Sequence, residues 1–204
     1  MAMHRSKSID EGIARMIIQV TEAVSERDCR RLMMMYDQHA HLSATRDQTG
    51  HPVVYWCHFR DAPSADEIVR RLVGACLRYI SSASIFVDPL YPETVVLAAL
   101  PPGGCHSPHA DNCSQNEEGD WVPNHTPQRD ASAIYYLNDD FEGGEIVFTR
   151  EKLEVKPRQG LLVAFPSDGA HAHEVLPVRT GIRYTVPIWF TKQKALALKN
   201  VSLQ

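Results

Sequence analysis

The stretch SAIYYLNDDFEGGEIVFT, residues 132–149, decides the fold class of this chain. Two short apolar runs, 132–137 and 145–149, flank residues 140–144, whose paired glycines accept the positive φ angles of a tight turn and so predict a hairpin. Similar runs separated by glycine, proline and aspartate recur nearby, and they are 94–100, 153–156, 161–165, 172–177 and 182–190. Many short strands with turn signals between them predict a β-sandwich or a β-barrel.

The chain before residue 94 shows mainly helical patterns. Residues 16–20 predict a short strand, and Ser25 is a typical N-cap for a helix that runs to about His39. Ser64 and Glu67 predict a capping box at the start of a second helix, which ends near Ile80, and the aromatic run 53–59 predicts an edge strand. Both helices are amphipathic, so we expect them to back one β-core. We therefore expect one domain, with a helical buttress at about 16–93 and a β-core at about 94–191.

The composition is that of an ordinary soluble globular protein. Hydrophobic residues make up 44%, charged residues make up 23%, and the formal net charge is -4. This charge gives no basic surface for nucleic acid or acidic lipid, so neither a nucleic acid nor a membrane is an expected partner. We find no signal-peptide pattern and no apolar run long enough to span a membrane. The five cysteines are odd in number and irregularly spaced, which indicates reduced thiols and a cytoplasmic protein.

The triplet His109-Ala110-Asp111 places an imidazole and a carboxylate on the same side of an extended chain. Together with the distant His173, these residues make the two-histidine, one-carboxylate set that binds Fe(II) by one face and leaves other positions open. Arg183 follows ten residues later inside an apolar run, and its planar guanidinium matches a carboxylate. The four side chains are the parts needed to bind iron and to anchor 2-oxoglutarate.

Other interpretations of these residues are open at the level of sequence. An H-x-D triplet is frequent, so His109 and His173 also fit polar loop histidines, and His171 is an alternative third ligand. Arg183 also fits a surface ion pair. A zinc site is a further alternative, although its spacing lacks paired C-x2-C knuckles, and its ligands are Cys105, His106, His109 and Cys113. There is no G-x-S-x-G elbow and no phosphate-binding glycine loop to indicate a hydrolase or a kinase.

Three separated motifs resemble the Fe(II)- and 2-oxoglutarate-dependent prolyl hydroxylases, most closely the catalytic domain of the prolyl 3-hydroxylases (leprecans), and they are also similar to prolyl 4-hydroxylases. The motifs are HADNC (109–113), RDASAIYYLNDDFEGGEIVFT (129–149) and HEVLPVRTGIRYTVPIWFT (173–191). The resemblance covers roughly residues 94–191. It implies a mainly β fold with flanking helices, in which a double-stranded β-helix (jelly-roll, cupin-like) core is backed by two N-terminal α-helices.

The resemblance also implies roles for single residues. His109, Asp111 and His173 match the iron ligands, and Arg183 matches the catalytic-site residue that pairs with the 5-carboxylate of 2-oxoglutarate. Tyr136 matches a tyrosine that binds the same carboxylate in the hypoxia-sensing prolyl hydroxylases, and strand alternation then turns Tyr135 to the opposite face. Trp189 is expected to line the pocket, and a buried structural tryptophan is the alternative. The implied reaction uses Fe(II), 2-oxoglutarate and O2, with ascorbate as a candidate further cofactor, and it hydroxylates an unactivated C–H bond.

A prolyl residue in a protein or peptide is the leading substrate that the resemblance implies. The alternatives are a free amino acid or another small metabolite, and a non-catalytic metal-binding β-barrel that serves as an interaction module. His106 and Pro101 stand where many prolyl 4-hydroxylases have tyrosines, and the chain ends in VSLQ without an endoplasmic-reticulum retention signal. These departures favour a cytoplasmic enzyme over one that acts on collagen. Residues 43–63 and 112–128 are candidates for a lid or a peptide groove.

Overall fold

The computed structural model describes residues 16–43, 52–199 and 201. Its largest element is a six-stranded antiparallel sheet with the strand order β1-β11-β7-β14-β3-β2, which we call the major sheet. In chain order its strands are β1 (Ile18–Val20), β2 (Val53–Tyr55), β3 (Tyr91–Leu100), β7 (Ala131–Tyr136), β11 (Leu162–Pro166) and β14 (Arg183–Thr191).

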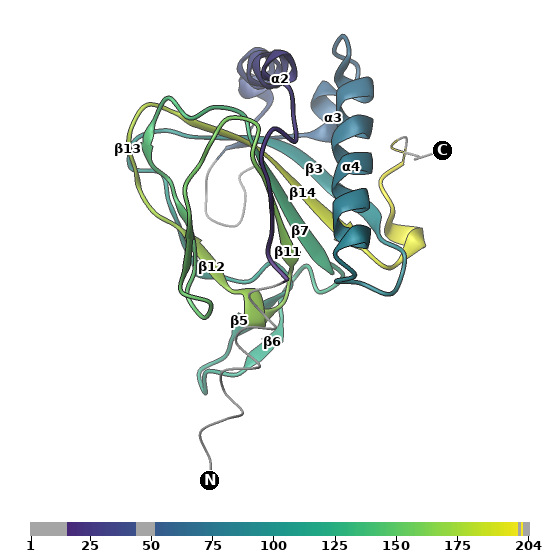
Figure 1. Cartoon of the computed structure of the whole chain (residues 1–204), viewed down its shortest axis with the longest axis vertical. Coiled ribbons are helices and arrows are strands. Elements are labelled where there is room, and N and C mark those ends of the chain that lie inside the picture. The colour runs from purple at the N-terminus through teal and green to yellow at the C-terminus, as the bar shows by residue number, and fades with distance from the viewer. Residues whose placement is uncertain (1–15, 44–51, 200, 202–204) are drawn as a thin grey trace.

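A second, four-stranded antiparallel sheet lies opposite the major sheet, and we call it the minor sheet (Figure 1). Its strands, in spatial order, are β10 (Leu153–Val155), β9 (Ile146–Phe148), β12 (His173–Val175) and β4 (His106–His109). The chain passes repeatedly between the sheets, because β7, β11 and β14 belong to the major sheet while β9, β10 and β12 belong to the minor one. This alternation forms the double-stranded β-helix that the sequence predicts.

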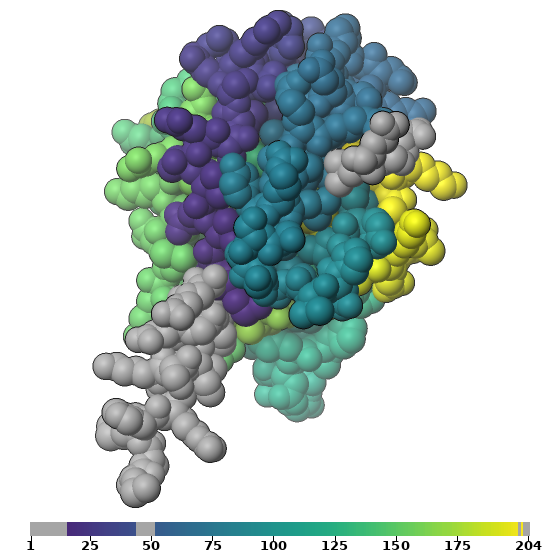
Figure 2. Space-filling model, turned by 45° about the vertical axis from the view of Figure 1, so that its right-hand side comes forward, coloured from purple at the N-terminus to yellow at the C-terminus, as the bar shows by residue number. Residues whose placement is uncertain are grey.

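Three helices cover the outer face of the major sheet, and they are α2 (Glu26–His39), α3 (Trp56–Phe59) and α4 (Ala65–Ser82). Figure 1 shows α3 and α4 on the side of the major sheet that faces away from β12, and Figure 2 shows the purple and blue atoms of this region over the face turned to the viewer. The predicted pair of long helices is thus confirmed, and α3 is an added short one. No described helix is long and apolar enough to cross a membrane.

Both faces of the major sheet are largely buried, and successive residues along its strands point alternately to one face and to the other. Along β14, Val186, Ile188 and Phe190 pack against the helices, whereas Arg183 and Thr185 line a cavity between the two sheets. The same alternation along β7 turns Tyr135 to the helices and Tyr136 to the inter-sheet core, as predicted.

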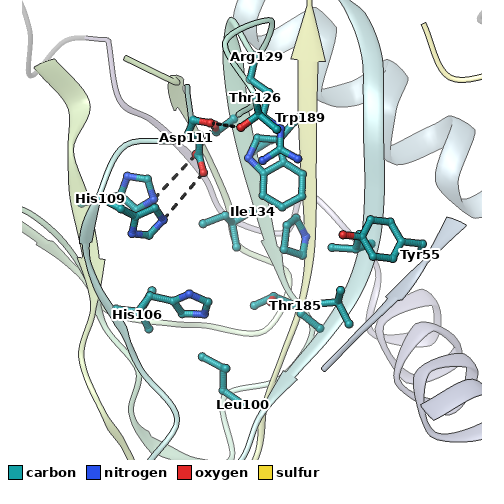
Figure 3. A pocket seen from close by; sticks show the side chains of 18 of the residues that line it. Tyr55, Leu100, His106, His109, Asp111, Thr126, Arg129, Ile134, Thr185 and Trp189 are labelled. Atoms are coloured by element: carbon teal, nitrogen blue, oxygen red, sulfur yellow. Dashed lines mark hydrogen bonds and ion pairs between the residues drawn. The ribbon is translucent and has the colours of Figure 1, made fainter. Parts of the chain in front are cut away.

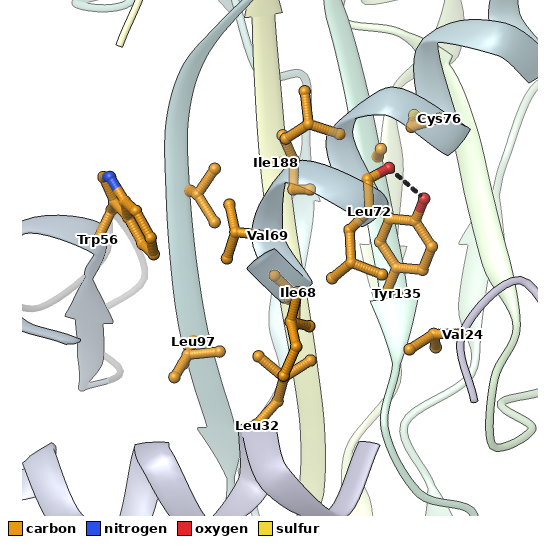
Figure 4. Close-up of a cluster of buried hydrophobic side chains, with 14 of the residues drawn as sticks. Val24, Leu32, Trp56, Ile68, Val69, Leu72, Cys76, Leu97, Tyr135 and Ile188 are labelled. Carbon is orange, nitrogen blue, oxygen red and sulfur yellow. Dashed lines mark hydrogen bonds between the residues drawn. The ribbon is translucent and has the colours of Figure 1, made fainter. Parts of the chain in front are cut away.

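The core between the helices and the major sheet is shown in Figure 4. It contains Leu32 from α2, and Ile68, Val69 and Leu72 from α4. The buried Tyr135 hydroxyl donates a hydrogen bond of 2.7 Å to the Leu72 carbonyl, so a sheet strand and α4 are joined inside this core. Burial of apolar surface on this scale is the main force that holds helices to a sheet.

The predictions for the helical region were correct for α2 and partly wrong for its neighbours. The Asp28 amide donates to Ser25 Oγ over 3.2 Å, as an N-cap requires. Ser64 also precedes its helix, but it has a left-handed φ of 66° and its side chain makes no capping bond, so the predicted capping box is wrong. Glu67 instead forms an ion pair with Arg71 one turn along α4.

The predicted strand 53–59 is half strand and half helix. β2 ends at Tyr55, and α3 then runs through Trp56 and Phe59, which are both buried. Two large buried side chains three residues apart are the spacing of one helical face, which explains why the aromatic run does not continue as a strand.

The predicted hairpin at residues 140–144 is wrong, although its glycines do take positive φ angles of 81° at Gly143 and 67° at Gly144. β7 and β9, which flank this segment, lie in different sheets. Between them the short strand β8 (Glu142–Gly143) pairs with β13 (Val178–Thr180). A Cβ atom on Gly143 would lie 2.1 Å from the Pro177 carbonyl oxygen, so the glycine permits a close crossing between sheets.

Candidate active site

The three predicted metal ligands meet at the inner face of the minor sheet. His109 on β4 and His173 on β12 are register partners in neighbouring strands, and Asp111 follows β4 by two residues. His109 Nε2 lies 3.9 Å from Asp111 Oδ1, and His173 Nε2 lies 4.0 Å from Asp111 Oδ2 (Figure 3). One ligand atom from each residue lies within 4.8 Å of the others, which is close enough to share a metal ion.

Hydrogen bonds fix the tautomer of both histidines. His109 Nδ1 lies 2.8 Å from the Ser107 carbonyl oxygen, and His173 Nδ1 lies 3.1 Å from the His171 carbonyl oxygen. A carbonyl only accepts hydrogen bonds, so each Nδ1 carries the proton and each Nε2 keeps its lone pair. Metal-binding histidines are oriented by backbone carbonyls in this way. The donor set therefore fits Fe(II), which suits two imidazoles and a carboxylate with open positions.

The charge states of the buried ligands also suit a metal ion. Burial lowers the pKa of His173 to about 4, even though the Asp111 carboxylate acts in the opposite direction. His173 is therefore neutral near pH 7 and able to bind a metal. Burial alone would raise the pKa of Asp111, but the two histidines, the Ser132 hydroxyl and Arg129 outweigh it and lower this pKa. Asp111 is consequently an ionised ligand.

The structure does not fit the alternative interpretations of these histidines, which were a zinc site, His171 as the third ligand, and polar loop residues. Among the described residues, the His, Cys, Asp and Glu side chains close enough to share an ion are His109, Asp111 and His173. The zinc site proposed from Cys105, His106, His109 and Cys113 is therefore wrong. His171 is not in the group that is close enough to share an ion, and its Nδ1 lies 2.7 Å from Asp168 Oδ1, so His173 and not His171 is the third ligand candidate. His109 and His173 both lie in strands, and His173 is buried, so neither is a polar loop residue.

Arg183 lines the same cavity as the three ligands, and it is only 3% exposed to solvent. Its Nε donates to the Gly144 carbonyl over 3.1 Å, and its Nη2 donates to the Tyr136 hydroxyl over 3.3 Å. Within the described part of the chain no carboxylate lies within ion-pairing distance of it, so the surface ion-pair interpretation is wrong. A buried guanidinium without a carboxylate is a strong binding site for an anionic group.

The shared cavity has a volume of about 350 Å³ and lies between the two sheets. Apolar side chains line much of it, among them Leu100, Ile134 and Val175. Trp189 lines it as predicted. Tyr136 is fully buried and lies behind Arg183 instead of on the cavity wall, with its ring centroid 4.9 Å from the guanidinium carbon.

Arg129 is a cavity residue that the sequence predictions missed. Its guanidinium carbon lies 4.0 Å from the Trp189 ring centroid, and its Nε donates to Glu93 Oε2 over 3.4 Å. Figure 3 shows Arg129, Trp189 and Asp111 at one end of the pocket, with Leu100 at the other. The available signal was its position, because a cation two residues before the largely apolar, buried strand β7 has to find a buried partner.

The two segments predicted as a lid or a groove contribute to the same cavity. Val53 and Tyr55 line it from the first segment, while residues 44–51 of that segment lie outside the described residues. His125 and Thr126 line it from the second segment. Between Asp111 and His125 the chain forms a hairpin of β5 (Cys113–Gln115) and β6 (Trp121–Pro123), which projects from the end of the β-core (Figure 1). A lid function stays a prediction.

Comparison with known proteins agrees with the fold and the site. Residues 95–191 match the family model of the 2OG-Fe(II) oxygenase superfamily, and this matched region contains the β-helix and the His-Asp-His set. More particularly, the chain is 40% identical over 94 residues to human prolyl 3-hydroxylase 2, and it is equally similar to the rat protein. Each alignment covers 42% of this chain and 13% of the relative, so the chain spans only a small part of those proteins.

Solved structures of prolyl hydroxylases share the fold. A viral collagen prolyl hydroxylase from Paramecium bursaria Chlorella virus-1, in a complex with 2-oxoglutarate, has a TM-score of 0.66 at 19% identity and covers 86% of this chain and 95% of its own. A prolyl-4-hydroxylase from Pseudomonas putida has a TM-score of 0.65 at 20% identity and covers 91% of this chain and 98% of its own.

Proposed function

We propose that this protein is an Fe(II)- and 2-oxoglutarate-dependent dioxygenase that hydroxylates a prolyl residue in a protein or peptide. The observation that carries the proposal is the single cavity that contains both the His-Asp-His set and the buried Arg183. A metal site alone has many uses. A metal site that shares an apolar cavity with a carboxylate-binding guanidinium has the parts for a dicarboxylate co-substrate.

In this proposal His109, Asp111 and His173 hold Fe(II) through the two Nε2 atoms and a carboxylate oxygen. The bound metal and 2-oxoglutarate supply the oxidation of a C–H bond by O2, with succinate and carbon dioxide as the by-products. The protein contributes the positions of the reactants. The Nδ1 hydrogen bonds to backbone carbonyls keep both imidazoles in the metal-binding tautomer throughout the reaction.

We further propose that Arg183 binds the 5-carboxylate of 2-oxoglutarate. Two of its N–H groups are used by Gly144 and Tyr136, and the others are available to a carboxylate in the cavity. The Tyr136 hydroxyl accepts a hydrogen bond from Arg183, so its own proton is free to be donated onward. Since Tyr136 lies behind Arg183, its main role in this proposal is to orient the guanidinium. Trp189 forms the wall beside the metal end, and Leu100, Ile134 and Val175 exclude water.

The prolyl substrate is supported by the relatives, whose printed names are prolyl 3-hydroxylases and prolyl hydroxylases. A free amino acid would bring a carboxylate to the substrate end of the pocket. There the one buried cation found among the cavity residues besides Arg183 is Arg129, which is already paired with Glu93. This pairing favours the neutral backbone of a peptide. A purely non-catalytic barrel gives no reason for the buried Arg183.

The substrate is tested by supplying Fe(II), 2-oxoglutarate and O2 to the purified protein, with and without ascorbate, and adding prolyl peptides and free amino acids in turn. Mass spectrometry of each substrate should show one added oxygen atom on a prolyl peptide, with succinate formed in equal amount. Addition of oxygen to free proline or another free amino acid, with none on any peptide, would support the small-metabolite alternative and reject the peptide substrate.

We also propose that the protein works in the cytoplasm. Cys29 and Cys76 are fully buried, and burial raises the pKa of the Cys29 thiol to about 11, which keeps it protonated. Buried thiols of this kind suit a reducing compartment. Fractionation of cells that produce the protein, followed by immunodetection, should find it in the cytosolic fraction, and its recovery from a secretory compartment would reject this location.

A further inference from the structure

Two buried serines lie directly behind the candidate metal centre, on the side of Asp111 that faces the major sheet. Ser132 belongs to β7, and Ser167 follows the neighbouring strand β11. Ser132 is the register partner of Phe165, so the two serines approach each other where the strands are paired. Both residues are 2% exposed. Ser132 lines the cavity beside Asp111, whereas Ser167 is not part of the cavity lining.

The hydrogen bonds among these residues run in one direction. Ser132 Oγ lies 2.5 Å from Asp111 Oδ2 and 2.7 Å from Ser167 Oγ. Ser132 Oγ is the donor to Asp111 Oδ2, since a carboxylate that serves as a metal ligand only accepts hydrogen bonds. The oxygen of Ser132 is then left to accept, and Ser167 must donate to it. The order Ser167 to Ser132 to Asp111 forms a relay in which each bond polarises the next.

The backbone supports the same arrangement. The Ser167 carbonyl accepts the amides of Asp111 and Asn112, each over 3.1 Å, and Thr126 Oγ1 donates to the Asp111 carbonyl over 2.9 Å. The side chain of Asp111 is thus bonded to strand β7 of the major sheet, and its main chain to Ser167 beside β11 and to Thr126, whereas His109 and His173 belong to the minor sheet. Asp111 lies in neither sheet, and the serine relay is the side-chain link that holds its carboxylate in place.

From this geometry we propose, on the basis of the function given above, that Ser132 is a positioning residue for the metal centre. With Ser167 behind it, Ser132 holds Asp111 Oδ2 and thereby presents Oδ1 to the metal as a single ligand atom. A carboxylate without this bond turns more freely and binds through both oxygens, which occupies a position that the co-substrate or O2 needs. Groups that hydrogen-bond to a metal ligand typically change metal affinity by about 10- to 100-fold.

Titration of the metal-free full chain with Mn(II), followed by electron paramagnetic resonance of the free ion, tests the relay without any turnover. Ser132→Ala should weaken Mn(II) binding by about tenfold or more. Ser132→Cys keeps most of the side-chain volume but has only a weak S–H donor, so it should resemble Ser132→Ala. If Ser132 matters only for packing, the cysteine variant restores wild-type affinity and the proposal is overturned.

A double-mutant comparison separates a relay from two independent serines. Ser167→Ala alone should weaken Mn(II) binding by a smaller factor than Ser132→Ala, and it should have no further effect when Ser132 is already alanine. Equal effects of Ser167→Ala in both backgrounds would overturn the relay. Unchanged Mn(II) affinity in Ser132→Ala would overturn the positioning role as well. Thermal unfolding of each metal-free variant shows whether the fold is retained.

The coordination mode has its own measurement. Visible absorbance of bound Co(II) weakens as the number of ligand atoms rises, so Ser132→Ala should give weaker bands per bound ion than the wild type. Identical bands would reject the assignment of Oδ1 as a single ligand atom. These results are independent of catalysis: a wild-type protein that binds Mn(II) through Asp111 but forms no succinate refutes the proposed activity and leaves the relay testable.

Discussion

Single residues at the candidate metal centre are oriented by bonds that leave one defined atom for the metal. Backbone carbonyls hold the Nδ1 atoms of His109 and His173, and Ser132 holds Oδ2 of Asp111. Because rotation of any of these side chains breaks a hydrogen bond, the site is largely formed before a metal arrives. Preorganisation of this kind lowers the cost of binding.

The two neighbouring histidines give a matched pair of variants for the metal site. His173→Ala should weaken Mn(II) binding by more than about 100-fold, which exceeds the range for a group outside the ligand set. His171→Ala should weaken it by less than about tenfold, because the His171 carbonyl that orients His173 belongs to the backbone and is retained. Equilibrium dialysis with Mn(II) checks both. A larger loss of Mn(II) affinity in His171→Ala than in His173→Ala would show that the third ligand is His171 and not His173.

Arg183 should control the binding of 2-oxoglutarate more than the binding of metal. Arg183→Met removes charge-assisted hydrogen bonds, so we expect the KM for 2-oxoglutarate to rise by about 10- to 100-fold, while Mn(II) affinity stays near that of the wild type. Tyr136→Phe loses only the bond that orients the guanidinium and should raise this KM by less than about tenfold. An unchanged KM in Arg183→Met would show that the co-substrate binds elsewhere.

The sequence is informative about residues whose chemistry follows from their type and spacing. His109, Asp111, His173 and Arg183 are of this kind, since few other combinations bind both a metal and a dicarboxylate. Ser132, Ser167 and Arg129 were not predicted. Serine is common in strands, and its role here arises only because β7 and β11 are neighbours in the sheet. Pairing between distant strands is not encoded in local sequence patterns.

At the scale of elements, the helical layer is attached to the major sheet by two tyrosines of different burial. Tyr135 on β7 donates from inside the core to the Leu72 carbonyl of α4 over 2.7 Å. Tyr184 on β14 donates to Asp37 Oδ1 of α2 over 3.0 Å, at an exposed position. An edge-on contact with Tyr36, whose ring centroid is 5.7 Å away, accompanies the second bond. The two hydroxyl groups therefore allow the stabilising effect of a buried hydrogen bond to be compared with that of an exposed one.

Removal of the two hydroxyls should destabilise the protein unequally. Tyr135→Phe loses a buried hydrogen bond and should lower the free energy of unfolding by about 1 kcal/mol or slightly more. Tyr184→Phe loses an exposed bond, for which water substitutes, so its effect should stay below about 0.5 kcal/mol. Urea unfolding followed by circular dichroism measures both. An equal or greater loss in Tyr184→Phe would mean that the α2 contact, and not the core contact, attaches the helices.

The repeats of hydrophobic residues, with a period of two in strands and 3.6 in helices, predicted most elements correctly. They did not predict which strands pair. The runs that became β3, β7, β11 and β14 were found because both their faces are buried and therefore apolar. β4 and β8 were missed because they contain polar residues, proline or glycine. The predicted hairpin at 140–144 was wrong because glycines with positive φ angles indicate a turn but do not determine which strands pair on either side of it. β8 pairs with β13, far along the chain.

At the scale of the whole molecule, we propose that the helical region and the β-core form one domain. One apolar cluster contains side chains from α2, α3 and α4 together with strands β3, β7, β11 and β14 of the major sheet. A helical layer that shares its core with the sheet has no separate core of its own to support independent folding.

Unfolding should therefore be a single cooperative event. The fluorescence of the tryptophans, which include Trp56 in the helical layer and Trp189 in the β-core, and far-ultraviolet circular dichroism should give the same urea midpoint. Two separated midpoints would show that the helical region and the β-core unfold independently, and would contradict the single-domain proposal.

The central claim is that one cavity holds both Fe(II), on His109, Asp111 and His173, and 2-oxoglutarate, on Arg183. The most direct test measures succinate formed from 2-oxoglutarate by the Fe(II)-loaded wild type and by Asp111→Ala, in the presence of a substrate that the wild type hydroxylates. Circular dichroism checks the fold of each protein. We predict Fe(II)-dependent succinate formation by the wild type and no substrate-coupled turnover by the folded variant. Full succinate production by Asp111→Ala would contradict the assignment.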